Sequence, residues 1–417
     1  MAVLGPSSLS CNAEPGSRSE RAVLERGPTS QRETEAQAAS PRGSEFEAGG
    51  RTADTSGSAT TAQAVPAAVA TQANDSATRP ETEVWAGTLP TLQAWLQGGW
   101  SESPARTVGI LDGNEAEIFG WIIAARVAAS GLFILDRMSM DVRWFRDGRF
   151  IGRIGRAGSG PGEFREPSDL IIDSLGNVHV LDTARGQIAV FSVDSSGASQ
   201  LMRTIKTPVF ASSFCQWGAT YYLLAPDSAA VLHHIDAQGS LLRSVGKPFP
   251  LPTAEQQLPA NWQSVLLMLR NRGKLVCAPA RNTIVVVNET EPVVRAFRPD
   301  GSLLWETEVA NHRSMRHVML APGGPMRSAP DPETQTAQFA LTAVLVDSTT
   351  LAVSYQEDMF RFSTDFQARY EVRLLSLASG REFQRAQAPG ALAGISRDQV
   401  FAIAKDPFPH IGVYAVR

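Results

Sequence analysis

The residues that could carry chemistry are few and mostly isolated. Six histidines occur, none with the His-Glu-x-x-His spacing that binds zinc on a helix, and the three cysteines form no Cys-x-x-Cys pair. No Gly-x-Ser-x-Gly string supplies the exposed nucleophile of a hydrolase. The motifs therefore predict no catalytic residue and no metal ligand, and three cysteines are too few for a disulfide-stapled scaffold.

Four residues remain as candidates for binding. Asp169 and Asp173 flank a short apolar segment, and Arg137 and Arg185 each follow a turn aspartate. Carboxylates in such places usually bond to solvent or backbone, and arginines beside turns usually lie on a solvated rim. A binding role for any of the four depends on where the surrounding elements place them.

Those elements repeat along the chain. Segment 131–136 aligns with segment 176–182, since both contain a turn glycine, an apolar strand and a final aspartate. The strands that follow end at Phe145 and Phe191, in the same register. Equivalent strands end at Phe145, Phe191, Ile235, Phe297, Leu375 and Tyr414. Six units of about 40 to 50 residues, two of them enlarged by insertions, predict an all-β, six-bladed β-propeller.

The last unit lacks its outer strand, because only three residues follow Tyr414. An uncovered strand edge invites aggregation, so another segment must pair there. The isolated strand 107–111 precedes the first full unit. We predict that it completes the final blade, with Ile110 beside Val413.

Composition divides the chain into three parts. Residues 1–83 contain one aromatic residue and no Ile, Lys or His, so they cannot bury enough apolar surface to offset the entropy cost of ordering. We expect a disordered tail over 1–83, a linker over 84–106 and the propeller over 107–417.

Charge and hydropathy exclude several classes of partner. The chain has 38 basic and 42 acidic residues, a net charge of −4. The first 83 residues hold 7 of the basic and 11 of the acidic residues, leaving 31 of each for the folded part. We therefore expect no nucleic-acid partner, since an RNA-binding surface requires a basic face. The sequence contains no apolar run of about 18 residues, so we expect no transmembrane segment. The first residues also lack the basic and apolar regions of a signal peptide.

One stretch resembles a known family. The string Gly158-Ser-Gly-Pro-Gly-Glu-Phe-Arg-Glu-Pro167, continuing to Asp182 and Phe191, resembles an NHL repeat and is similar to the bacterial six-bladed NHL propellers. In this string Phe164 is expected to wedge between blades and Pro167 to open an inner strand. The resemblance implies a non-catalytic binding or scaffold propeller without a cofactor, a monomer whose loops meet a protein, peptide or carbohydrate. It also implies export, although the start of the chain shows no signal.

An alternative stays open within the same fold. Propellers of this general shape include metal-dependent lyases and lactonases, in which a divalent ion sits in the central channel. Two insertions, 247–273 and 309–336, depart from the family pattern. The first has apolar residues spaced for a short amphipathic helix, which is either a packed loop or a lid over the channel. They are Leu258, Trp262, Val265, Leu266 and Leu269.

Overall fold

The computed structural model describes residues 88–99, 103–253, 255–319, 326–330, 333, 335–359, 368–396 and 398–416. All of them belong to one unit, 75–417. The predicted tail 1–83 and the first residues of the predicted linker 84–106 lie outside the described residues.

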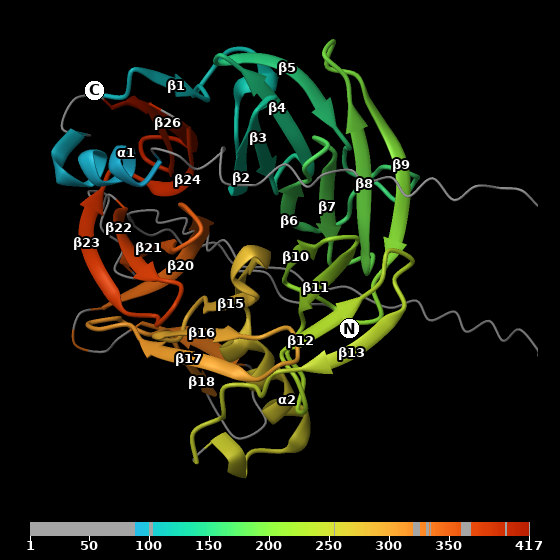
Figure 1. Ribbon diagram of the computed structural model, residues 1–417, viewed down its shortest axis with the longest axis vertical. Coiled ribbons are helices and arrows are strands. Elements are labelled where there is room, and N and C mark those ends of the chain that lie inside the picture. Colours follow the sequence, from blue (N-terminus) through green and yellow to red (C-terminus); the bar gives the residue numbers. More distant parts are fainter. Residues whose placement is uncertain are drawn as a thin grey trace, which may run out of the picture. The chain divides into compact units, whose positions relative to one another are not determined.

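Six four-stranded antiparallel sheets form the described part of this unit (Figure 1). Each sheet is one blade, and its strands follow one another from the innermost to the outermost. Blade 1 contains β2 (Ile122–Ala128), β3 (Gly131–Asp136), β4 (Asp141–Arg146) and β5 (Arg149–Ile154). Blade 2 contains β6 (Pro167–Ile172), β7 (Val178–Asp182), β8 (Gln187–Val193) and β9 (Ser199–Lys206). Blade 3 contains β10 (Ser213–Trp217), β11 (Thr220–Leu224), β12 (Leu232–Ile235) and β13 (Leu241–Val245). Blade 4 contains β14 (Gly273–Ala278), β15 (Thr283–Asn288), β16 (Val293–Phe297) and β17 (Leu303–Glu308). Blade 5 contains β20 (Thr336–Leu345), β21 (Thr350–Met359), β22 (Arg369–Ser376) and β23 (Glu382–Ala388). Blade 6 contains β24 (Ala391–Ile395), β25 (Gln399–Ala404), β26 (His410–Ala415) and β1 (Arg106–Val108).

The blades close into a ring. Each innermost strand contacts the innermost strand of the next blade, and β24 of blade 6 contacts β2 of blade 1. All six third strands contain the residues predicted from the repeat, from Phe145 in β4 to Tyr414 in β26. The six-bladed propeller is therefore confirmed (Figure 1).

Apolar side chains between neighbouring blades hold the ring together. Phe164 is fully buried between blades 1 and 2, as predicted, and contacts the Phe191 ring edge-on at 5.9 Å between centroids. Gly155 has a φ of +73°, and a Cβ there would lie 2.1 Å from the Phe164 ring. A side chain at position 155 would therefore both strain the backbone and displace the wedge.

The N-terminal strand completes the last blade, although not in the predicted register. β1 pairs with β26, and Arg106 lies opposite Val413 while Val108 lies opposite Ile411. Ile110 does not pair beside Val413, so that part of the prediction is wrong. Gly109 turns the chain away with a φ of +118°, and the Ile110 amide donates to the Glu117 carbonyl instead.

A helix lies within the interval predicted as a linker. α1 (Thr88–Ala94) continues into a π-helical turn, η2 (Trp95–Gly99). Leu92 and Trp95 are fully buried against blades 5 and 6, and the Trp95 ring contacts Tyr414 at 5.7 Å. This segment thus adds a second contact between the start of the described chain and its end.

The insertions carry their own elements. The first contains η4 (Glu255–Gln257) and the predicted helix, α2 (Ala260–Asn271), whose Leu266 is buried. The second contains the hairpin β18 (Arg316–Met319) and β19 (Met326–Ala329). Short 3-10 turns, η3 (Glu115–Glu117) and η5 (Pro279–Arg281), complete the described elements. Among the described helices, none is long and apolar enough to cross a membrane.

The packing of Trp95 leads to a first prediction. Trp95→Ala leaves a cavity between η2 and the last two blades, so the free energy of unfolding should fall by about 3 kcal/mol. Urea denaturation followed by circular dichroism measures this. Trp121→Ala is the matched control, because the Trp121 side chain is 42% exposed and its loss should change stability little. Equal stabilities of the two variants would show that η2 does not support the ring.

Candidate functional site

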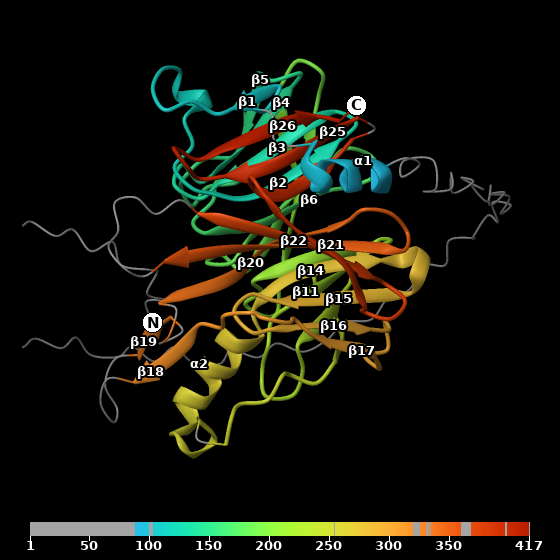
Figure 2. The same cartoon turned by 90° about the vertical axis from the view of Figure 1, so that its left-hand side faces the viewer.

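One end of the ring gathers most of the elaborated structure. The innermost strands begin there, so this end carries the connections between blades and the turns between second and third strands. We call it the crossover face. Both insertions emerge from it, and Figure 2 shows α2 and the β18–β19 hairpin on the same side. Loops held on a rigid scaffold are where propellers of any function place their binding residues.

Buried arginines hold the long connections of this face in place. Three arginines occupy the same position of the third strand, two residues before its repeated apolar residue, and each is at most 3% exposed. Each donates to a backbone carbonyl in the connection that leads into its own blade. The donor and acceptor pairs are Arg143 and Ile118 in blade 1, Arg295 and Lys247 in blade 4, and Arg373 and Ala310 in blade 5.

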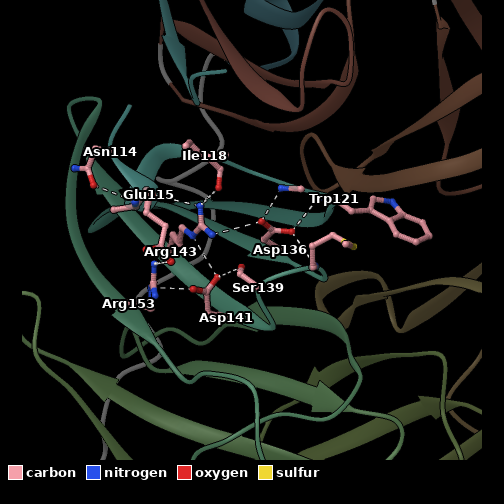
Figure 3. Close-up of polar contacts among 12 residues, drawn as sticks. Asn114, Glu115, Ile118, Trp121, Asp136, Ser139, Asp141, Arg143 and Arg153 are labelled. Carbon is pink, nitrogen blue, oxygen red and sulfur yellow. Dashed lines mark hydrogen bonds and ion pairs between the residues drawn. The ribbon is translucent and has the colours of Figure 1, made fainter. Parts of the chain in front are cut away.

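In blade 1 the buried guanidinium is compensated by two carboxylates (Figure 3). Arg143 lies 3.3 Å from Asp141 and 3.5 Å from Asp136. Asp141 also forms an ion pair with Arg153 at 2.8 Å. A buried cation is stable only with such partners, so the network fixes the connection 109–121 relative to the blade.

The buried guanidinium groups of blades 4 and 5 have other partners. Arg373 pairs with Glu371 at 2.5 Å and with Glu382 at 3.2 Å. Arg295 has no carboxylate at ion-pair distance among the described residues, since Glu306 acts on it only from farther away, and it donates to the Asn271 side chain at 3.0 Å. Burial therefore lowers the pKa of Arg295 to about 10. Its bonds tie both ends of the first insertion to the blade.

Arg185 and Asp173, two of the predicted binding residues, have structural partners. Arg185 donates to the Gly160 and Glu163 carbonyls and thereby holds the glycine-rich connection between blades 1 and 2. Asp173 lies at the opposite end of the ring, in the turn after β6, and accepts bonds from Asn177 and the buried His179. Burial opposes ionisation of Asp173, but these hydrogen bonds hold the pKa of its carboxyl below the usual value.

Arg137 lies on the rim of the crossover face beside exposed apolar residues. Its guanidinium pairs with Glu166 at 2.7 Å and lies 5.2 Å from the centre of the Trp121 ring. Asp136 accepts from the backbone amides of Trp121 and Met138 and so fixes both residues. Trp121 is 42% exposed and Met138 is 69% exposed.

The next connection continues this surface. Phe210 leads into blade 3 and is 76% exposed. Its neighbour Ala211 accepts a hydrogen bond from Thr183, whose amide donates to the Glu166 carbonyl. Trp121, Arg137, Met138 and Phe210 thus lie on connected turns of blades 1 to 3, and we call them the aromatic strip.

Asp169 lies on the innermost strand β6 and lines a cavity in the central channel. It is 2% exposed, pairs with Arg126 at 3.0 Å and accepts a hydrogen bond from Ser213 at 2.6 Å. Asp169 and Asp173 lie at the two ends of β6 and share no bonding partner among the described residues.

The described cavity in the channel does not offer the ligands of a divalent cation. Ca²⁺ and Mg²⁺ prefer several oxygen ligands with a negative charge excess. The described cavity in the channel contains one carboxylate, Asp169, together with the cations of Arg126 and Lys274. Among the described residues, no group of three His, Cys, Asp or Glu side chains could hold a metal ion. These residues do not fit the metal centre of a propeller lyase or lactonase.

Several features of the site were missed at the sequence level. The aromatic strip joins residues of three different connections, and no spacing in the sequence relates them. A disulfide joins Cys215 of β10 to Cys277 of β14, across blades 3 and 4. Their separation of 62 residues carries no motif, and only their equivalent strands could have suggested the pair.

Comparisons with known proteins agree with the architecture. A family model described as 6-bladed beta-propeller, DUF5128, matches residues 111–239. No curated protein matches the chain in sequence. Among solved structures, a putative exported protein from Bacteroides fragilis is 12% identical with a TM-score of 0.44, over 72% of this chain and 83% of that one.

Two further structures illustrate the range of neighbours. A member of the duf4221 family from Bacteroides vulgatus is 8% identical with a TM-score of 0.44, over 75% of this chain and 98% of that one. A streptogramin B lyase is 9% identical with a TM-score of 0.38, over 74% of this chain and 97% of that one. Similarity this low has no bearing on what the chain binds or catalyses.

The arginine anchors lead to a second prediction. Arg295→Met keeps the apolar stem but removes the donor to the Lys247 carbonyl and one of the two donors to the Asn271 side-chain oxygen, the other being the Phe249 amide. We expect chymotrypsin to cleave within 246–272 about tenfold faster, because a loss of about 1.4 kcal/mol in local stability raises the open population tenfold. Arg298→Met, an exposed position on the following turn, is the control and should cleave like the wild type. Unchanged cleavage in Arg295→Met would show that the anchor is dispensable.

Proposed function

We propose that the chain is a non-catalytic binding propeller of the NHL type, whose crossover face docks a protein partner. The observation that supports this best is the aromatic strip, in which the half-buried Arg137 stacks on the exposed Trp121 ring and Met138 and Phe210 are exposed on neighbouring turns. Trp, Phe, Met and Arg are enriched at protein interfaces, and Trp and Arg dominate their binding energy. Isolated apolar residues are common on any surface, but a connected group of this composition is not.

The strip is also preorganised. Asp136 holds the amides of Trp121 and Met138, and Glu166 holds the Arg137 guanidinium against the indole ring. Side chains already fixed in place lose little conformational entropy when a partner binds. The Arg143 network behind Asp136 makes this arrangement a rigid part of blade 1.

The chemistry of the strip favours a protein over a carbohydrate. A sugar needs polar groups around a stacking ring, whereas Trp121 stacks with Arg137, and the other exposed residues of the strip, Met138 and Phe210, are apolar. The Asp136 and Glu166 carboxylates beside the strip are already engaged. Apolar side chains of a partner protein match this surface better.

Photo-crosslinking in the native cells tests the proposal. Benzoylphenylalanine replaces Phe210 in one variant and Leu175 in the control, because Leu175 is 86% exposed at the opposite end of blade 2. We expect a single protein adduct from position 210 and none from position 175. Trp121→Ala should reduce the yield at position 210 at least tenfold, as expected for an interface hot spot. Protein docking would be refuted by the same adducts from positions 210 and 175. It would also be refuted if no protein adduct formed and Trp121→Ala lost the binding of a glycan.

We also propose an extracytoplasmic location, and the Cys215–Cys277 disulfide supports it. Disulfides form and persist in oxidising compartments and are rare in the cytosol. This bond joins the innermost strands of two blades, so it would constrain the channel wall between them. The observation is independent of the aromatic strip.

Thiol labelling of the protein from its native cells tests the compartment. Under denaturing, non-reducing conditions, Cys215 and Cys277 should resist alkylation and should react fully after reduction. Cys277→Ser provides the control, because it leaves Cys215 without a partner and open to alkylation. Labelling of both cysteines before reduction would place the protein in a reducing compartment.

A further inference from the structure

A small cavity lies in the central channel, bounded by five of the six innermost strands. It has room for about one water-sized group and opens partly to the channel. Its lining residues are Ile123, Ala124 and Arg126 of β2, Asp169 of β6, Ser213 of β10, Lys274 and Leu275 of β14, and Leu341, Thr342 and Ala343 of β20. Neither the fold nor the docking surface requires polar side chains at this place.

The charges around this cavity do not cancel. Arg126 is paired with Asp169 at 3.0 Å, and Arg272 at the start of β14 is paired with Glu289 through two nitrogens at 2.8 Å. Lys274 has no hydrogen-bond or ion-pair partner among the described residues. It interacts with Glu289 only over a longer distance. One positive charge is therefore left over at the cavity.

One of the two hydroxyl groups at the cavity also lacks a hydrogen-bond partner among the described residues. The Ser213 hydroxyl is fully used, since it donates to Asp169 and accepts from the Leu275 amide. Thr342 is 3% exposed, and its Oγ1 is buried without a partner among the described residues. Buried hydroxyls are nearly always bonded, so an unpartnered one at the wall of a cavity points to something that occupies the cavity.

We propose that this cavity binds a small monovalent anion, a halide or a carboxylate group. The Lys274 ammonium supplies the charge, the Thr342 hydroxyl donates a hydrogen bond, and Arg126 adds further positive potential from β2. A cation is disfavoured there, because its only carboxylate, Asp169, is already neutralised by Arg126. A neutral water would satisfy Thr342 but would leave the charge of Lys274 uncompensated. The proposal does not depend on the docking of a protein partner.

Bromide and formate are suitable probes for the full-length protein. Crystals soaked in bromide should show one anomalous peak in the cavity, bounded by Lys274 and Thr342. Titration with formate at constant ionic strength should give saturable binding by calorimetry. Formate binding with no bromide peak would identify the anion as a carboxylate, and bromide binding without formate binding would identify it as a halide.

Two variants make the assignment specific. Lys274→Gln removes the charge, and Thr342→Val removes the donor while keeping the shape of the side chain. Each should raise the dissociation constant of the probe at least tenfold and abolish the bromide peak. Lys206→Gln is the matched control, because Lys206 lies on the outermost strand β9, where it bonds to Gln187. It should bind both probes like the wild type.

The stability of Thr342→Val separates a binding role from a structural one. In buffer free of halides and carboxylates, this variant should be at least as stable as the wild type, because it loses only an unpartnered hydroxyl. Addition of formate should raise the melting temperature of the wild type and of Lys206→Gln, and should leave Thr342→Val unchanged. The proposal would be overturned if bromide-soaked crystals held only water in the cavity and formate also failed to bind, or if probe binding persisted in both Lys274→Gln and Thr342→Val.

Discussion

A buried guanidinium must be compensated, and this requirement shapes the crossover face. The ring itself needs only apolar strands and short connections, as in blade 6, whose third strand carries Gly412 where blades 1, 4 and 5 carry arginine. Blades 1, 4 and 5 have long connections, and in each of them a buried arginine reaches from the third strand to a carbonyl of that connection. The carbonyl of the connection satisfies a donor of the buried arginine, and the arginine in turn ties the connection to the blade.

This mutual dependence lets a regular scaffold carry irregular structure. The insertion that contains α2 is tied at both of its ends to Arg295, through the Lys247 carbonyl and the Asn271 side chain. The connection into blade 1 is tied through Ile118, and the same cluster orients Asp136, which in turn positions Trp121. The backbone of Trp121 and Met138 in the aromatic strip is thus held by contacts in the interior of blade 1. Rigid presentation of apolar and cationic side chains is what a binding surface requires.

The channel follows a related principle of charge pairing. Arg126 with Asp169 and Arg272 with Glu289 join side chains of different strands and leave each pair neutral. Lys274 breaks this pattern, and the unpartnered Thr342 hydroxyl lies at the wall of the same cavity. Lys274 is one of few lysines in the chain, and it lies partly exposed on the innermost strand β14 without an ion-pair partner among the described residues.

Local sequence periodicity determined most of the architecture. Turn glycines and aspartates, followed by apolar strands ending at residues such as Phe145 and Phe191, predicted six blades because each unit forms its sheet from residues close in sequence. The missing outer strand after Tyr414 predicted closure by the N-terminal segment. Its register was predicted wrongly, because Gly109 adopts a positive φ that ends β1 before Ile110. Phe164 and Pro167 took their predicted places, since their roles are local.

The candidate site, in contrast, was decided by tertiary structure. Asp169 was a binding candidate in the sequence, yet its partners Arg126 and Ser213 come from other blades, more than 40 residues away in each direction. The Cys215–Cys277 bond, the aromatic strip and the Lys274 cavity likewise combine residues of separate units. Sequence alone determined that this protein is a ring of six similar sheets, because strand and turn formation depend on neighbouring residues. Only the closed ring decided which side chains meet, because the distances between blades arise when apolar wedges pack the sheets against one another.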